Sequence, residues 1–214
     1  MQRIGFSRCS CETGELIKNG GFEIRSREPD YPFQYWKQVN ANFAIINNSP
    51  NVTIVAYEGL SAARFQSFDS AAEVDKSVSL QQTVIVTPGG SYKLSFAENL
   101  LIKGNTTAAA IPILTARVLY VDNFGNDVDL IIVPIFKFSP DHDPNRGYTF
   151  HEIATDVPVP CDVSELIVRF DYFENSTDGS VWLLDGVSLR AVSPTSACCE
   201  DNKRCVFSSR YQER

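Results

Sequence analysis

The sequence predicts an all-β protein in which antiparallel strands pack as a sandwich. The first observation is an alternation of side-chain character over residues 77–86, followed by the turn Pro88-Gly89-Gly90 and a second alternation over 92–96. This pattern predicts two half-buried strands joined as a β-hairpin. The second observation is that short strands recur at regular spacing with turn residues between them, as in sandwiches and barrels. The other strands are expected at 116–120, 128–138, 166–172 and 181–189.

The third observation is size. The chain has 214 residues, of which 43% are hydrophobic and 21% charged, so it can bury a sizeable core. We expect one sandwich domain at 16–192, with short extended tails at 1–15 and 193–214. The best helix candidate, 71–76, is too short to organise a fold.

Charge and hydropathy exclude some partners. The formal net charge is -7, which disfavours nucleic acid because phosphate binding needs clustered Lys and Arg. No apolar run reaches the roughly 20 residues that span a bilayer. Residues 1–9 lack the apolar core of a secretory signal, so either a signal has been removed or none is used.

The six cysteines lie mostly on the predicted tails. A zinc site is one interpretation, but zinc sites usually show C-x2-C pairs. We favour disulfides between tails or between chains, because a sandwich of this size needs no internal staple. The candidate cross-linking residues are Cys9, Cys11, Cys161, Cys198, Cys199 and Cys205.

Pro134 marks the apolar segment 130–136 as an edge strand, because proline donates no ladder hydrogen bond. The segment is apolar on both faces, and an apolar edge is a template for another chain. Either a neighbouring loop covers this edge or the protein associates with itself through it.

Three segments resemble the jelly-roll carbohydrate-binding modules attached to xylanases and glucanases, which are sandwiches of the galactose-binding-domain type. They are Leu16-Ile-Lys-Asn-Gly-Gly-Phe-Glu23, the stretch 80–96, and Val181-Trp-Leu-Leu-Asp-Gly-Val-Ser-Leu189. They follow the family's order and cover roughly 16–190. The resemblance implies an antiparallel jelly-roll β-sandwich, but it is a poor guide to function, because one scaffold hosts many functions.

The resemblance also implies a structural calcium ion held by a carboxylate from each of the first and last strands. Glu23 and Asp185 occupy those positions, and hard oxygen ligands suit Ca²⁺. The family commonly has a second acidic residue where this chain has Gly186, so one potential ligand is missing.

Sugar binding is the second implied feature, because aromatic rings stack on pyranose faces. The candidates follow the first strand: Tyr31, Phe33, Tyr35 and Trp36. The same segment is equally typical of core packing, and Trp182, within the last strand, is expected to be structural.

No catalytic constellation is evident. The only histidines are His142, in an expected loop, and His151, in an expected strand, so a Ser-His-Asp arrangement has few ways to form. Pro88-Gly-Gly90 lacks the Gly-Lys-Ser/Thr of a phosphate loop. We therefore expect a non-enzymatic protein.

Two functions remain. The first is a structural surface protein that assembles with itself through disulfides between its tails, with fibres as one form of assembly. The tails look similar to those of bacterial spore-surface proteins. The alternative is a free-standing protein that binds a cell-wall or extracellular polysaccharide. Either function places the protein outside the cell, on a cell or spore surface.

Overall fold

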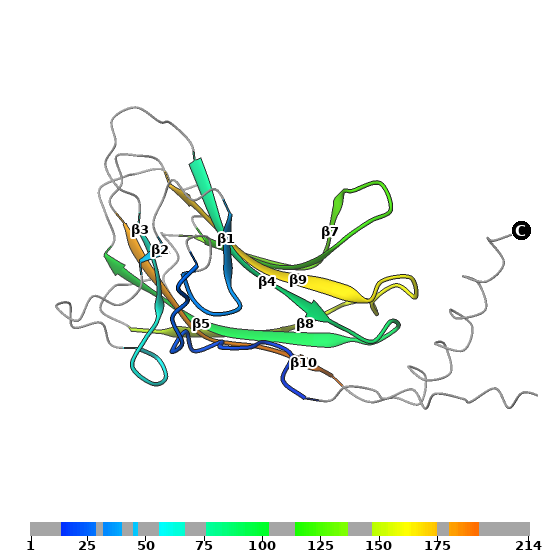
Figure 1. Ribbon diagram of the computed structural model, residues 1–214, viewed down its shortest axis with the longest axis horizontal. Coiled ribbons are helices and arrows are strands. Elements are labelled where there is room, and N and C mark those ends of the chain that lie inside the picture. The colour runs from blue at the N-terminus through cyan, green and yellow to red at the C-terminus, as the bar shows by residue number, and fades with distance from the viewer. Residues whose placement is uncertain are drawn as a thin grey trace, which may run out of the picture.

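Two five-stranded antiparallel sheets pack face to face in the computed structural model, and this confirms the predicted sandwich (Figure 1). The structure describes residues 14–28, 32–39, 45–46, 56–66, 76–102, 114–136, 147–174 and 180–192. The first sheet has the order β1 (Lys37–Val39), β4 (Lys76–Ile85), β9 (Glu165–Glu174), β6 (Leu114–Val121) and β7 (Asp127–Ile135). The second has the order β2 (Ile45–Ile46), β3 (Ala63–Gln66), β10 (Val181–Ala191), β5 (Tyr92–Ile102) and β8 (Thr149–Ala154). Within these residues, no helix is long and apolar enough to span a membrane.

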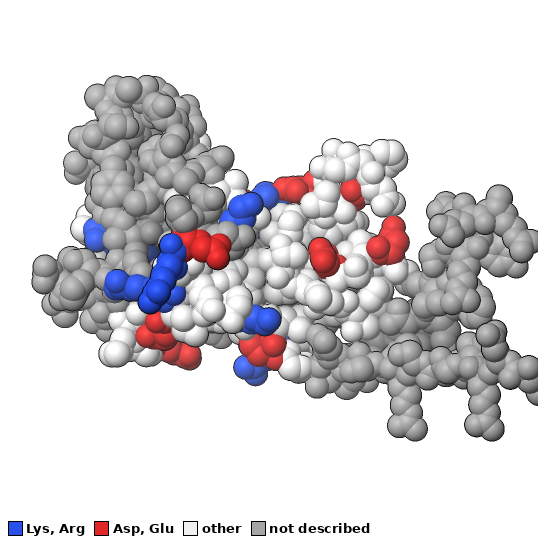
Figure 2. Space-filling model, in the orientation of Figure 1, with Lys and Arg blue, Asp and Glu red and all other residues white. Residues whose placement is uncertain are grey.

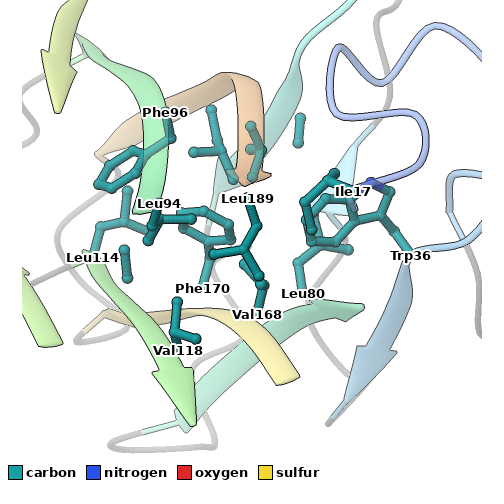
Figure 3. Close-up of a cluster of buried hydrophobic side chains, with 14 of the residues drawn as sticks. Ile17, Trp36, Leu80, Leu94, Phe96, Leu114, Val118, Val168, Phe170 and Leu189 are labelled. Carbon is teal, nitrogen blue, oxygen red and sulfur yellow. The ribbon is translucent and has the colours of Figure 1, made fainter. Parts of the chain in front are cut away.

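The core lies between the sheets and follows the alternation seen in the sequence. Alternate residues of β4 and β9 point inward and are almost fully buried. Figure 3 shows Phe170 of β9 among core side chains from both sheets. Its ring centroid lies 5.3 Å from that of Phe96 on β5 and 6.2 Å from that of Trp36. Burying each such ring contributes about 1.5–3 kcal/mol to stability.

Gln82 is the polar exception in the inward register of β4. Its side-chain amide accepts from Lys18 N at 2.8 Å and donates to Lys18 O at 2.9 Å, so its burial leaves no polar group unpaired. These two bonds attach the first described segment to the sandwich.

The predicted hairpin between 77–86 and 92–96 is wrong. Strand β4 pairs with β1 and β9, whereas β5 pairs with β10 and β8 in the other sheet. The Pro88-Gly-Gly90 turn, with Gly89 at φ +77°, therefore carries the chain from one sheet to the other. Alternation reports which face of a strand is buried, but it does not report the partner strand.

Strand β7 is the edge of the first sheet, as Pro134 predicted. It pairs only with β6 among the described strands, and Pro134 lies opposite Thr115. The strands β6 and β7 form a hairpin whose turn places Gly125 at φ +84°. A register shift between Val118 and Leu119 marks a β-bulge, which bends the sheet. The helix candidate 71–76 is not seen as one, because Lys76 begins β4 and the rest lies outside the described residues.

Candidate functional site

Two of the aromatic residues proposed as sugar contacts belong to the core. Phe33 and Trp36 are fully buried, and their rings lie 5.0 and 5.3 Å from the ring of Phe22. The Trp36 indole N–H donates to Asn19 O at 3.0 Å. A buried ring presents no face to a ligand, so the core-packing interpretation of these two residues holds.

Tyr35, another proposed sugar contact, has an exposed side chain. Tyr35 is 46% exposed, and Lys18 Nζ lies 5.3 Å from its ring centroid. Tyr31 lies outside the described residues. Trp182 is fully buried beside Phe65 on β3, as expected of a structural residue.

Glu23 and Asp185 both bind the loop at residues 56–61. Asp185 Oδ2 accepts hydrogen bonds from Tyr57 N at 2.8 Å and Glu58 N at 2.9 Å, while Oδ1 accepts from Gly186 N at 2.7 Å. Glu23 Oε1 accepts from Leu60 N at 2.7 Å and Ser61 N at 2.9 Å. The two carboxylates, far apart in sequence, thus hold one loop against the second sheet.

This donor set does not fit the calcium ion that the resemblance implies. Ca²⁺ takes six to eight oxygen ligands. Here three of the four carboxylate oxygens of Glu23 and Asp185 accept hydrogen bonds from backbone N–H groups, so most of this donor set is already used by the loop. No group of three or more His, Cys, Asp or Glu that could hold a metal occurs among the residues the structure describes. Burial still raises the pKa of Asp185 to about 6, against the effect of its three N–H bonds.

Of the six cysteines, only Cys161 falls in the described part of the chain. It is exposed and free, in the loop before β9. Cys9, Cys11, Cys198, Cys199 and Cys205 lie outside the described residues, so cross-linking stays a prediction.

The outer face of the first sheet is hollow. Figure 1 shows the sheet curving upward at the β6–β7 hairpin on one side and at the start of β4 on the other. Figure 2 shows blue and red atoms meeting in the depression between them. Charged side chains of both signs therefore line this face.

Two arginines and three aspartates form the centre of the hollow face. Arg117 on β6 and Arg169 on β9 are directly opposite each other, an arrangement that repels unless carboxylates lie between. Arg117 makes a bidentate pair with Asp129, at 2.7 and 2.8 Å. Arg169 reaches Asp127 at 2.9 Å and Asp171 at 3.2 Å. We call these five residues the Arg–Asp network.

Burial shapes the electrostatics of the Arg–Asp network. Both arginine side chains are 18% exposed. Partial burial raises the pKa of Asp171, although Ser79 Oγ donates to its carboxylate. The hydrogen bonds to Asp129 raise the pKa of Arg117. Every guanidinium is thus compensated, and the face offers rigidly held donors and acceptors without a free positive charge.

An open groove of about 390 Å³ lies where the β6–β7 hairpin meets the segment before β9. Thr83 and Ile167 belong to the outer face of the sheet, and three carboxylates add negative charge; the lining acids are Asp122, Asp162 and Glu165. The Asp122 carboxylate accepts N–H bonds from Phe124 and Asn126, which lower its pKa.

The histidine that the structure describes contributes nothing to this face. His151 lies on β8 in the other sheet, stacked on Phe96 with centroids 4.7 Å apart, and its Nε2 lies 3.3 Å from Glu98 Oε1. His142 lies outside the described residues.

Comparison with known proteins identifies the fold. No family model and no curated protein match the chain. Among solved structures, it is similar to the CBM22-1 xylan-binding domain of Xyn10C from Paenibacillus barcinonensis, with a TM-score of 0.50 and 13% identity over 87% of this chain and 99% of that one. The CBM22-1–CBM22-2 tandem of the same enzyme gives a TM-score of 0.50 and 14% identity, over 87% of this chain and 49% of that one. The module TmCBM61, solved with β-1,4-galactotriose, gives 0.46 and 19%, over 84% and 99%.

The chain has the fold of a carbohydrate-binding module. The resemblance drawn from three sequence segments is therefore confirmed for the fold, and at these identities it extends no further. The similarity of the tails to spore-surface proteins stays a prediction.

Sequence reasoning missed the Arg–Asp network of this carbohydrate-binding-module fold. A signal was present: Arg117, Arg169 and Asp171 are charged residues at outward positions in the middle of strands whose inward positions are apolar. Their convergence depends on the pairing of β9 with β6 and of β6 with β7, which no single segment of sequence reveals.

Proposed function

We propose that this chain is a non-catalytic protein that binds a neutral extracellular polysaccharide on the hollow face of its first sheet. The observation that carries the proposal is the Arg–Asp network, a set of half-buried polar groups held rigidly in a surface depression. Sugar hydroxyls both donate and accept hydrogen bonds, so they can pair with guanidinium N–H groups and with carboxylate oxygens. The similar domain from Xyn10C binds xylan, which supports the same ligand class for this chain.

Charge favours a neutral ligand over an acidic one. Three carboxylates outnumber two guanidinium groups in the network, and Asp122, Asp162 and Glu165 line the adjoining groove. A polyuronate would meet uncompensated negative charge here and at the acidic surface of the chain as a whole.

Affinity electrophoresis in gels containing soluble xylan, β-1,4-galactan, mixed-linkage glucan or polygalacturonate tests the proposal. We expect retardation by at least one neutral polysaccharide, with little dependence on salt. Arg169→Gln should weaken binding about tenfold, since hydrogen bonds from charged groups contribute about 1.5–3 kcal/mol each.

Arg190→Gln is the matched control for Arg169→Gln. Arg190 also pairs with a carboxylate, Glu15 at 3.0 Å, but on the second sheet, and its side chain is 62% exposed. Equal effects of the two substitutions, or retention by polygalacturonate alone, would contradict the proposal.

Self-assembly through the terminal cysteines remains a separate prediction. The size of the protein under native, denaturing and denaturing-plus-reducing conditions tests it. Species that withstand denaturant and collapse to a monomer with reductant would establish it, whereas a monomer in all three conditions would exclude it.

A further inference from the structure

One row of side chains crosses the hollow face and includes both arginines of the Arg–Asp network. Arg169 on β9 lies opposite Gln81 on β4 and opposite Arg117 on β6. Arg117 in turn lies opposite Ile132 on β7, whose neighbour in sequence, Ile131, belongs to the core, so the row is on the outer face. Directly opposite residues have Cβ atoms about 5 Å apart, so each side chain adjoins the next. We call these four residues the arginine row.

The carboxylate oxygens of the Arg–Asp network are nearly all used within the network. Both oxygens of Asp129 accept from Arg117, at 2.7 and 2.8 Å. Both oxygens of Asp171 are used as well, by the hydroxyl of Ser79 and by the two guanidinium groups. Asp127 Oδ2 lies 2.9 Å from the second guanidinium. In the described part of the chain, these contacts leave Asp127 Oδ1 as the one network oxygen without a partner.

Both guanidinium groups, in contrast, keep N–H groups that the network does not use. A guanidinium carries five N–H donors in one plane. Arg117 makes one hydrogen bond through each of its three nitrogens, so a second N–H remains on Nη1 and on Nη2. Arg169 makes its contacts through Nε and Nη1, and its Nη2 is open to solvent, since the buried polar atoms without a partner in the described residues lie elsewhere. The hollow face therefore offers more free donors than free acceptors.

Aliphatic side chains flank these free donors. Ile132 is 56% exposed and is the neighbour of Arg117 in the arginine row. Ile167 lies two residues from Arg169 on the same face of β9 and lines the groove at the β6–β7 hairpin. None of the four residues of the row is aromatic, so the row gives a pyranose ring nothing to stack on. It offers instead a hydrogen-bond donor with an apolar surface beside it.

We propose that the arginine row recognises an acetyl group carried by the polysaccharide. The carbonyl oxygen of an acetyl group only accepts hydrogen bonds, which suits the free N–H groups of Arg117 and Arg169, and the methyl group would pack on Ile132. A hydroxyl supplies the acceptor without an apolar part. A carboxylate supplies it together with a negative charge, which the excess of carboxylates in the network repels. The inference rests on the proposed function, because it names the group on the polysaccharide that the hollow face selects.

Isothermal titration with pairs of neutral ligands that differ in acetylation tests the inference. One pair is O-acetylated galactoglucomannan before and after mild alkaline deacetylation. The other pair is N-acetylated chitohexaose and cellohexaose, which share a β-1,4-linked glucan backbone. We expect the acetylated member of at least one pair to bind about tenfold tighter, since a hydrogen bond from a charged donor contributes about that factor. The pair that shows the preference tells whether the acetyl group is an ester or an amide.

Ile132→Thr tests the contact with the methyl group. It should reduce the preference for the acetylated ligand, measured as the ratio of the two dissociation constants, about fourfold, which is the factor for one buried methyl or methylene group. Ile85→Thr is the matched control and should leave this ratio unchanged, since Ile85 is a 71% exposed residue of the same face that lies opposite Glu165. Both substitutions keep a β-branched side chain, so neither should lower the melting temperature appreciably.

The outcomes separate this inference from the proposed function. Equal affinity within both pairs, or equal effects of the two isoleucine variants, would overturn the inference and leave the proposed function standing. Binding of no member of either pair would also overturn the inference, and retardation by xylan or galactan would then decide the proposed function on its own. A preference for acetylated ligands that Arg169→Gln leaves intact would place the site on another surface and contradict both.

Discussion

Replacing Asp185 by alanine tests whether backbone amides take the place of a cation at this position. The substitution leaves the N–H groups of Tyr57, Glu58 and Gly186 without their acceptor. An orphaned, partly buried donor costs about 1–3 kcal/mol. Burial raises the pKa of Asp185 to about 6, which means that the charged carboxylate is costly to bury, and removing this charge offsets part of the cost. We expect a net loss of about 2 kcal/mol at neutral pH, or a fall in Tm of about 4–8 °C.

Thermal unfolding followed by circular dichroism, with added CaCl₂ and with EGTA, measures this effect. Because the loop amides already satisfy the carboxylates, we expect neither addition to shift the Tm of the intact chain. Asp156→Ala, at an exposed position, is the control and should change stability by less than about 0.5 kcal/mol. A Tm that EGTA lowers and calcium restores would refute the reasoning and establish the calcium site that the family resemblance implies.

Three further substitutions or conditions probe the same architecture. Because the folded-state pKa of Asp185 is raised, its contribution to stability is greatest below about pH 4 and declines as the pH rises through about 6. Within that window, the free energy of unfolding should fall by up to about 1.4 kcal/mol per pH unit relative to Asp185→Asn. Urea titrations of both proteins at each pH would measure this. Gly59→Ala should destabilise by about 1–3 kcal/mol, since its φ is +67° and a Cβ would lie 2.2 Å from Glu23 Oε1; a wild-type Tm would mean that the loop is not held as described. Trp36→Ala should cost about 3–5 kcal/mol because the indole is fully buried, and a stable variant that loses only sugar binding would instead identify Trp36 as a ligand contact.

Much of the fold could be predicted because each strand reports its buried face in its own sequence. The alternation over 77–86 matches β4 closely, and those over 166–172 and 181–189 lie within β9 and β10. Which strands pair with each other was harder to predict: β4 and β5 are consecutive in the sequence, yet they belong to different sheets. The bulge at Val118 and Leu119 breaks the period of two, so the face of the residues after it does not follow from alternation.

The candidate sites were harder to predict because their residues come together through the pairing and register of the strands, and not through a short sequence motif. Phe33 and Trp36 were conspicuous in sequence as an aromatic cluster, but apolar rings serve a core as readily as a ligand. Arg117, Asp129 and Arg169 come from three strands and meet only once those strands are paired. The resemblance placed Glu23 and Asp185 correctly near one another, while the loop that binds them lies elsewhere in the sequence.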